Sequence, residues 1–259
     1  MERPHDRARQ EDVLLEGLAH APKHPFLHAD ECNFLMSVGR AEAAFAQCQQ
    51  ASAMRPLAPP TNIANTQAMV QQGHLDWATN YLNHVSPYHP DNQELKVQLF
   101  EIGEFLGPPA ATEAQLQHPK MPNVQYWPGL RPMLLLLRAR TTGSPKDAEA
   151  AVAALRDAAR RGQSPRWVVM GASVLGRLDD AFAATREFPQ LDMDPSYLFE
   201  PATAAMRRDP RFWEVAERTG LLRYWKVRRV WPDFCSDRTA GVDCPTAARA
   251  SGAWARVAG

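Results

Sequence analysis

The chain has 259 residues, of which 45% are hydrophobic and 22% are charged, and its formal net charge is +0. A neutral chain has no global field to hold nucleic acid or an anionic membrane, so either role would need a local patch. The longest apolar run, Met133 to Leu137, is far shorter than the roughly 20 residues that a membrane-spanning helix needs. The charged N-terminus lacks the apolar core of a signal peptide.

Proline and glycine recur in the first half of the chain with a period of 34 residues. We expect each unit to hold two helices, with helix A running up to the glycine and helix B from the glycine to the proline. Small residues, Ala44 and Ala78, follow the glycine by five positions and allow helix B to approach helix A closely. The residues that keep the period are Pro22, Pro56 and Pro90, and Gly39, Gly73 and Gly107.

The pattern continues less regularly toward the middle of the chain. Gly107 is in phase, but two prolines follow it and Thr112 stands in place of the alanine. A proline-rich insertion covers Gln117 to Pro132, and the phase returns at Gly143 and Gly176. Successive glycines are therefore 34, 34, 36 and 33 residues apart. An accidental repeat in a bundle of alanine-rich helices is the alternative.

From Val13 to Phe188 the units resemble the tetratricopeptide repeat, a helix-turn-helix of 34 residues. The resemblance implies an all-α right-handed superhelix, so we expect repeats over residues 1–188, a helical and loop cap over 189–245 and a flexible tail over 246–259. Residues 1–22 would be a helix B without its helix A. The chain is therefore expected to be the C-terminal portion of something longer, or to begin with an atypical single-helix cap.

The segment from Pro195 onward resembles the end of tetratricopeptide-like domains that bacteria often fuse behind a winged-helix DNA-binding domain. The resemblance implies that the chain is a sensor or interaction half, and it says nothing about direct DNA contact by this chain. The aromatic residues of RYWKVRRVWPDFC (223–235) are expected to close the apolar end of the last helix pair, with the arginines outward. The matching residues are Leu198, Phe199, Pro201, Met206, Arg207, Asp209, Pro210, Arg211, Phe212, Gly220, Leu221, Tyr224, Trp225, Trp231, Pro232, Asp233, Phe234, Cys235 and Cys244.

A superhelix of this kind lines its concave face with the A helices. The residues that the repeat phase places there are mixed polar side chains, suited to an extended peptide or another protein's surface. They do not reproduce the basic clamp that some tetratricopeptide proteins use for an acidic C-terminus. The predicted groove residues are Asn33, Ser37, Gln67, Gln71, Glu101, Glu104, Arg140, Arg166 and Met170.

No set of residues assembles an acid, a base and a nucleophile, so we expect no enzyme, no cofactor and no metal. His20, His24 and His28 have the spacing of a metal-binding helix face, but Pro22 and Pro25 place them in a turn. Ser173 lies in a sequence that is similar to a nucleophile elbow, but Leu175 replaces the required glycine. The repeat phase assigns Ser173 to a helix A.

The four cysteines fall into two pairs with different expectations. Cys32 and Cys48 occupy positions that pack between helices A and B, so we interpret them as small buried apolar residues. Cys235 and Cys244 flank a short polar loop and could form a disulfide in an oxidising compartment. The sequence leaves that bond open, with a cytoplasmic location slightly favoured and a periplasmic one retained.

A non-catalytic protein-interaction or scaffold module is the leading functional hypothesis. The second is a sensor or regulatory C-terminal domain of a bacterial transcription regulator or signalling protein. The third is nucleic-acid binding through a basic and aromatic surface. That surface would consist of Arg223, Lys226, Arg228 and Arg229 with Tyr224, Trp225 and Trp231. The oligomeric state and the identity of the partner stay open.

Overall fold

The computed structural model describes residues 6–56, 58–110, 130–236 and 242–257, and every secondary-structure element assigned to them is helical. The prediction of an all-α fold is therefore confirmed for the described residues. Most of the predicted insertion and the loop between Cys235 and Cys244 lie outside them. The long helices are α1 (Arg7–His20), α2 (Pro25–Ser37), α3 (Ala41–Met54), α4 (Pro59–Gln71), α5 (Leu75–Val85), α6 (Gln93–Leu106), α8 (Leu130–Thr142), α9 (Pro145–Arg160), α10 (Arg166–Val174) and α11 (Leu178–Glu187).

Glycine forms the turn between the helices of four pairs. Positive φ is found at Gly39, Gly73, Gly143 and Gly176. This conformation costs about 1–2 kcal/mol for a residue that has a β-carbon. Gly107 differs, because it caps α6 with φ −77° and ψ 169°. The residue before a proline is pushed into extended backbone, so Pro108 prevents the left-handed turn found at the other four glycines.

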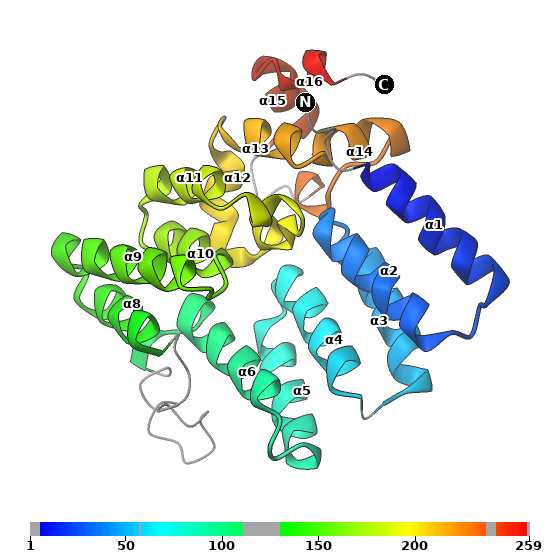
Figure 1. The fold of residues 1–259 in the computed structure, drawn as a ribbon, viewed down its shortest axis with the longest axis horizontal. Coiled ribbons are helices and arrows are strands. Elements are labelled where there is room, and N and C mark those ends of the chain that lie inside the picture. Colours follow the sequence, from blue (N-terminus) through cyan, green and yellow to red (C-terminus); the bar gives the residue numbers. More distant parts are fainter. Residues whose placement is uncertain (1–5, 57, 111–129, 237–241, 258–259) are drawn as a thin grey trace.

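Small residues let the helices of a pair approach each other. Ala44, Ala78 and Ala181 are completely buried, and Cys48 and Leu82 fill the same helix face four residues later. Each long helix contacts the next one along the chain, from α1 to α6 and from α8 to α11. The helices follow one another around a curve (Figure 1).

The chain after α11 passes between the earlier helices. The short helices η3 (Pro189–Asp192), η4 (Pro195–Phe199) and η5 (Pro201–Thr203) come first, and η4 contacts α2 and α10 while η5 contacts α6 and α10. Three further helices, α12 (Ala204–Arg208), α13 (Phe212–Arg218) and α14 (Leu221–Arg228), complete the arc. Helix α14 contacts α1, so the chain returns to its first helix at residues 221–228 (Figure 1).

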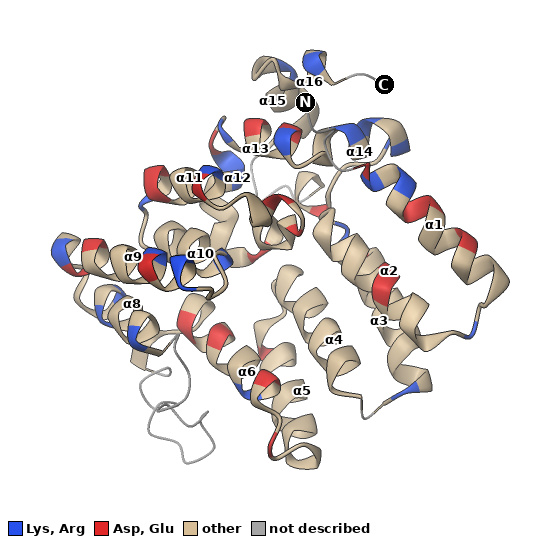
Figure 2. Ribbon diagram, viewed as in Figure 1, with Lys and Arg blue, Asp and Glu red and all other residues tan. Residues whose placement is uncertain are grey.

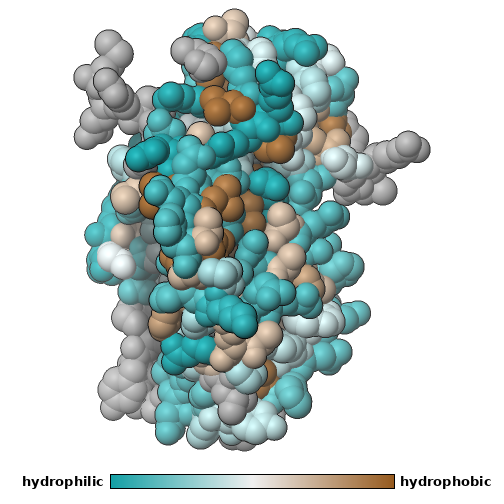
Figure 3. Space-filling view, turned by 90° about the vertical axis from the view of Figure 1, so that its right-hand side faces the viewer, coloured by the Kyte–Doolittle hydropathy of each residue, from teal (hydrophilic) through white to brown (hydrophobic). Residues whose placement is uncertain are grey.

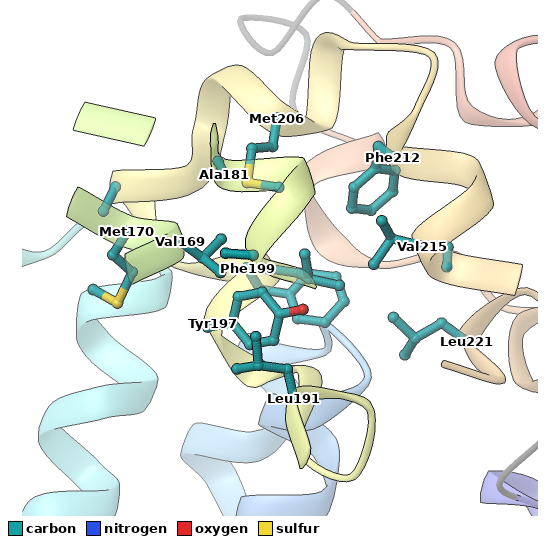
Figure 4. Packing of buried hydrophobic residues seen from close by; sticks show 14 of the residues in the cluster. Val169, Met170, Ala181, Leu191, Tyr197, Phe199, Met206, Phe212, Val215 and Leu221 are labelled. Atoms are coloured by element: carbon teal, nitrogen blue, oxygen red, sulfur yellow. The ribbon is translucent and has the colours of Figure 1, made fainter. Parts of the chain in front are cut away.

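A core of large side chains joins this C-terminal segment to the helix pairs. Tyr197, Phe199 and Phe212 lie together with Val169 of α10 and Met206 of α12 (Figure 4). The indole N–H of Trp225 donates to the backbone oxygen of Val38 at 2.9 Å, and the backbone N–H of Asp233 donates to Gly39 at 2.8 Å. The turn between α2 and α3 is therefore held by residues almost 200 positions away in sequence.

Charged groups fasten α14 to α1. Glu11 of α1 pairs with Arg228 at 2.5 Å and with Arg40 at 3.2 Å, and it accepts a hydrogen bond from the Tyr224 hydroxyl at 2.9 Å. Arg228 also contacts Asp12 at 2.6 Å. The expectation that the arginines of this segment point outward is therefore wrong for Arg228, because α1 supplies two carboxylates beside it.

The structure also differs from the flexible tail expected over residues 246–259. Helices α15 (Cys244–Ala250) and α16 (Ala253–Arg256) occupy most of that range and pack on the body. The Trp254 ring stacks on Trp231 with centroids 5.2 Å apart, and the Lys226 ammonium donates to Val257 at 2.7 Å.

All four cysteines are joined in disulfides. The Cys235–Cys244 bond, which the sequence leaves open, is present with a Cα–Cα distance of 5.6 Å. Cys32 and Cys48 are buried as expected, but they are also bonded to each other, with a Cα–Cα distance of 5.3 Å. Facing positions on α2 and α3 bring the two sulfurs together, so the interpretation as unlinked apolar residues is wrong.

No helix in the described part of the chain is long and apolar enough to cross a membrane. On the side of the molecule that carries α1, hydrophobic residues lie in small groups between hydrophilic ones (Figure 3).

Candidate ligand-binding hollow

A hollow of about 830 Å³ opens between α1, α2, α4 and the segment that runs from Met193 to Glu200. Its volume falls within the roughly 300–1,000 Å³ of typical ligand pockets. Helix α4 carries no charged residue, so this wall is polar but neutral (Figure 2). The charged groups of the lining come from α1, α2, α10 and residues 194–200.

Most of the predicted groove residues meet at this place. Five of them line the hollow, and a neighbouring recess of about 40 Å³ shares Gln67 and Arg166 and adds Glu101 and Met170. Helices α2, α4, α6 and α10 therefore bring seven of the nine predicted residues into one region. The five in the hollow itself are Asn33, Ser37, Gln67, Gln71 and Arg166.

Glu104 and Arg140 do not belong to the hollow, so their assignment to the groove is wrong. Glu104 is completely buried, and both of its carboxyl oxygens have no hydrogen-bond partner among the described residues. Burial raises the pKa of Glu104 to about 8, against the opposing effect of Arg140. Arg140 donates to the backbone oxygens of Glu104 and Gly107 at the end of α6, because α8 packs there and turns this arginine toward the helix terminus.

An ion pair fixes the floor between the hollow and the recess. The Arg166 guanidinium contacts both oxygens of Glu101 at 3.0 and 2.9 Å, and the Trp167 indole N–H donates to the same carboxylate at 2.6 Å. The nearby Glu101 carboxylate raises the pKa of Arg166 above its ordinary value. The two charges therefore compensate each other within the protein, although the Nε of Arg166 has no hydrogen-bond partner among the described residues.

Glu200 lies where the hollow and the recess meet, and it forms no ion pair with a described residue. Burial raises the pKa of Glu200 to about 7, and Glu101 adds to this effect while Arg166 opposes it. Close by, the Gln71 amide donates to the Ser196 backbone oxygen at 3.2 Å. The side-chain oxygen of Gln71 is buried without a hydrogen-bond partner among the described residues.

Several lining residues could not be found from the repeat phase. Arg7, Asp194, Ser196 and Glu200 lie before or after the units that carry the period, and they reach the hollow through the return of the chain across the A helices. Arg7 is only 2% exposed and donates to the backbone oxygens of Thr219 and Asp192 at 2.8 and 2.7 Å. Its charge is therefore held by the protein.

The histidines and the serine that the sequence offers as metal or catalytic candidates have structural roles. His20 ends α1, whereas His24 caps α2 and His28 contacts Gln47, so the three histidines do not share a helix. Within the described ranges no cluster of three His, Cys, Asp or Glu side chains could hold a metal ion. Ser173 lies inside α10 and is buried, as the repeat phase predicts for a helix A.

The basic and aromatic segment is folded into the core. Tyr224 and Trp225 are each 1% exposed, so neither ring can stack on a nucleic-acid base. Arg228 is engaged by Glu11 and Asp12, while Arg223 lies 3.8 Å from Asp6. The aromatic residues close the apolar end of the fold, as expected from the sequence.

Comparison with known proteins supplies no relative: the chain matches no protein-family model and no curated protein. The chemistry of the hollow therefore carries the functional argument. Its described walls combine neutral amides, the carboxylates Asp30, Asp194 and Glu200 without an ion pair, the engaged arginines Arg7 and Arg166, and the exposed Arg9 at the rim. Such a lining can bind a polar or cationic group without reacting with it.

Proposed function

We propose that this protein is a non-catalytic interaction module of the tetratricopeptide type, and that it holds an extended segment of a partner protein in the hollow. The observation that carries the proposal is the convergence of five predicted groove residues on one cavity of about 830 Å³. The repeat phase selects these positions from sequence alone, on helices that are separated along the chain.

Equivalent positions of the helix pairs support the repeat interpretation. The residue four positions after the small one is buried in every pair with a glycine turn: Cys48, Leu82, Val152 and Thr185. Glycine with positive φ stands before helix B in the same pairs. These features favour a right-handed superhelix of paired helices, which here would be closed by the contact between α14 and α1.

A binding role also agrees with the hydroxyl groups of the hollow. Ser37 donates to the backbone oxygen of Phe34 at 2.7 Å, so its oxygen is not activated by a neighbouring base. Arg7 and Arg166 are occupied by backbone and carboxylate partners. A nucleophile paired with a general base does not occur among the described lining residues.

The second candidate is a sensor domain of a bacterial regulator. It is favoured by the C-terminal residues that resemble such domains, because four of them, Phe199, Phe212, Trp225 and Phe234, form one cluster through edge-to-face and tilted ring contacts. A sensor would take a small ligand in the hollow. Thermal unfolding with a small-molecule library separates the two candidates: stabilisation by a compound that displaces a bound peptide would favour the sensor.

Peptide selection tests the leading proposal. A random displayed peptide library is selected on the full chain, and the Kd of an enriched peptide is measured by fluorescence anisotropy. The double variant Asn33→Ala/Gln67→Ala removes two lining amides that form no described hydrogen bond, and we expect it to weaken binding by about tenfold or more, as expected for interface groups worth at least ~1.4 kcal/mol together.

The matched control is Gln49→Ala/Gln50→Ala, which removes two exposed amides from α3 outside the hollow. We expect this control to bind the peptide as the unchanged protein does. Equal affinity of all three proteins for every enriched peptide would overturn the assignment of the hollow as the binding site.

A further inference from the structure

We propose that the hollow recognises a basic side chain, arginine or lysine, presented by an apolar stretch of the partner's peptide. This inference deepens the proposed function and rests on it. It concerns the chemical class of the partner segment rather than the location of the site.

The first step is the balance of free charge around the hollow. Asp30, Asp194 and Glu200 line it, and none of the three forms an ion pair within the described part of the chain. Of the lining arginines, Arg7 is held by two backbone oxygens and Arg166 by Glu101. The charged lining groups that are not paired within the protein are therefore mainly carboxylates, which favours a cationic ligand.

Arg9 is the exception to this balance. It lies on α1 at the rim of the hollow, is exposed and forms no ion pair in the described ranges. An exposed arginine beside solvent is well hydrated and free to move away, so it does not neutralise the carboxyl at the deep end. That deep end is Glu200, which also borders the inner recess.

The second step concerns buried polar groups of the lining that have no described hydrogen-bond partner. They are the acceptor oxygen of the Gln71 side chain and the donor Nε of Arg166, and the Gln71 amide also hydrogen-bonds to Glu200. A buried acceptor that stays unpaired costs about 1–3 kcal/mol. A guanidinium or ammonium group brings several donors and a positive charge, so it would satisfy Gln71 and Glu200 together.

The third step concerns the mouth of the hollow. Val13 of α1 and Met193, beside η3, both line it and are 53% and 69% exposed. Large apolar side chains with that much exposure at a cavity entrance are suited to contact apolar groups of a ligand. The lining therefore fits a cation flanked by apolar residues better than a strongly basic, fully polar segment.

The groups around Glu200 give this recognition a pH dependence. Arg166 from α10 and Arg207 from α12 favour its ionised form, whereas burial and Glu101 from α6 oppose it, and Gln71 from α4 donates toward it. Because these effects raise the pKa of Glu200 to about 7, a cation that needs the ionised carboxylate binds better as pH rises. The ionised fraction grows about tenfold between roughly pH 6 and pH 8, and the affinity should follow it.

The test uses the enriched peptides from the selection on the full chain, performed near pH 8. We expect peptides that depend on Asn33 and Gln67 to carry arginine or lysine next to apolar residues. Replacement of that arginine by citrulline, which keeps the shape and removes the charge, should weaken binding about tenfold. Glu200→Gln should weaken binding to a similar extent and abolish its dependence on pH.

Two further variants keep the test decisive. Asp194→Asn keeps a side-chain oxygen that can accept from the Ser196 backbone N–H at the start of η4, so it retains this cap and should still weaken binding of the basic peptide. Glu149→Gln removes an exposed carboxylate from the outer helix α9 and should leave binding unchanged. Circular dichroism verifies that each variant is folded.

The outcomes separate this inference from the proposed function. Peptides that need Asn33 and Gln67 but lack basic residues, or that bind Glu200→Gln and Asp194→Asn with unchanged affinity, would overturn the inference and leave the module intact. If no peptide depends on Asn33 and Gln67, the proposed function fails and this inference fails with it.

Discussion

Replacement of Gly39 by alanine tests whether the C-terminal segment packs against the turn between α2 and α3. Gly39 has a φ of +79°, and a β-carbon there would lie 2.5 Å from Phe199 and 2.7 Å from Pro232. Gly73 has nearly the same φ, +82°, but a β-carbon there would meet nothing within 4 Å. The two glycines therefore share the backbone cost of the substitution and differ in the contact.

The expected magnitudes follow from this difference. Gly73→Ala should lower the free energy of unfolding by about 1–2 kcal/mol, the cost of the left-handed conformation. Gly39→Ala should lower it by a further 1–3 kcal/mol or so, because Phe199 and Pro232 have to move. Since both substitutions change the unfolded chain in the same way, the comparison isolates the contact.

Urea unfolding of the two variants, followed by circular dichroism, measures both values. A significantly larger loss for Gly39→Ala is the expected result. Equal losses for the two variants would refute the packing of Phe199 and Pro232 on this turn, and with it the closure of the helices by the C-terminal segment.

Two further predictions concern the cysteines and Glu104. Thiol quantification of the denatured chain without reductant should find no free thiol, whereas full reduction should release the thiols of Cys32, Cys48, Cys235 and Cys244; equal counts would contradict both disulfides. Because burial raises the pKa of Glu104 to about 8, the folded chain binds this proton more tightly than the unfolded chain, and stability falls as pH rises from about 4.5 to 8. Glu104→Gln should remove a loss on the order of a few kcal/mol at about pH 8 and change little near pH 5, as urea unfolding at both pH values can show.

Local features of the sequence predict much of the fold. A glycine before each helix B identifies the turns at Gly39, Gly73, Gly143 and Gly176, because few other residues adopt a positive φ at low cost. The repeat phase also predicts a groove side for helices such as α2 and α4, and Asn33 and Gln67 of these helices line the hollow.

The remaining features depend on contacts between distant segments, which a local pattern does not encode. The ion pair between Glu11 and Arg228, which joins α14 to α1, leaves no periodic signal in the sequence. The packing of residues 193–200 against α2 and α10 leaves none either. The repeat phase assigns Glu104 to the groove, but this residue is completely buried on α6, which α8 contacts. The acidic part of the hollow, Asp194 and Glu200, was missed for the same reason.

Photo-crosslinking tests the central claim most directly, the claim that the hollow is the binding site. An enriched peptide carrying a benzophenone group is bound to the full chain, irradiated and mapped by mass spectrometry. The account predicts attachment to the lining of the hollow, on α1, α2, α4 or residues 193–200. Attachment confined to the outer helices α3, α5, α9 or α11 would contradict it.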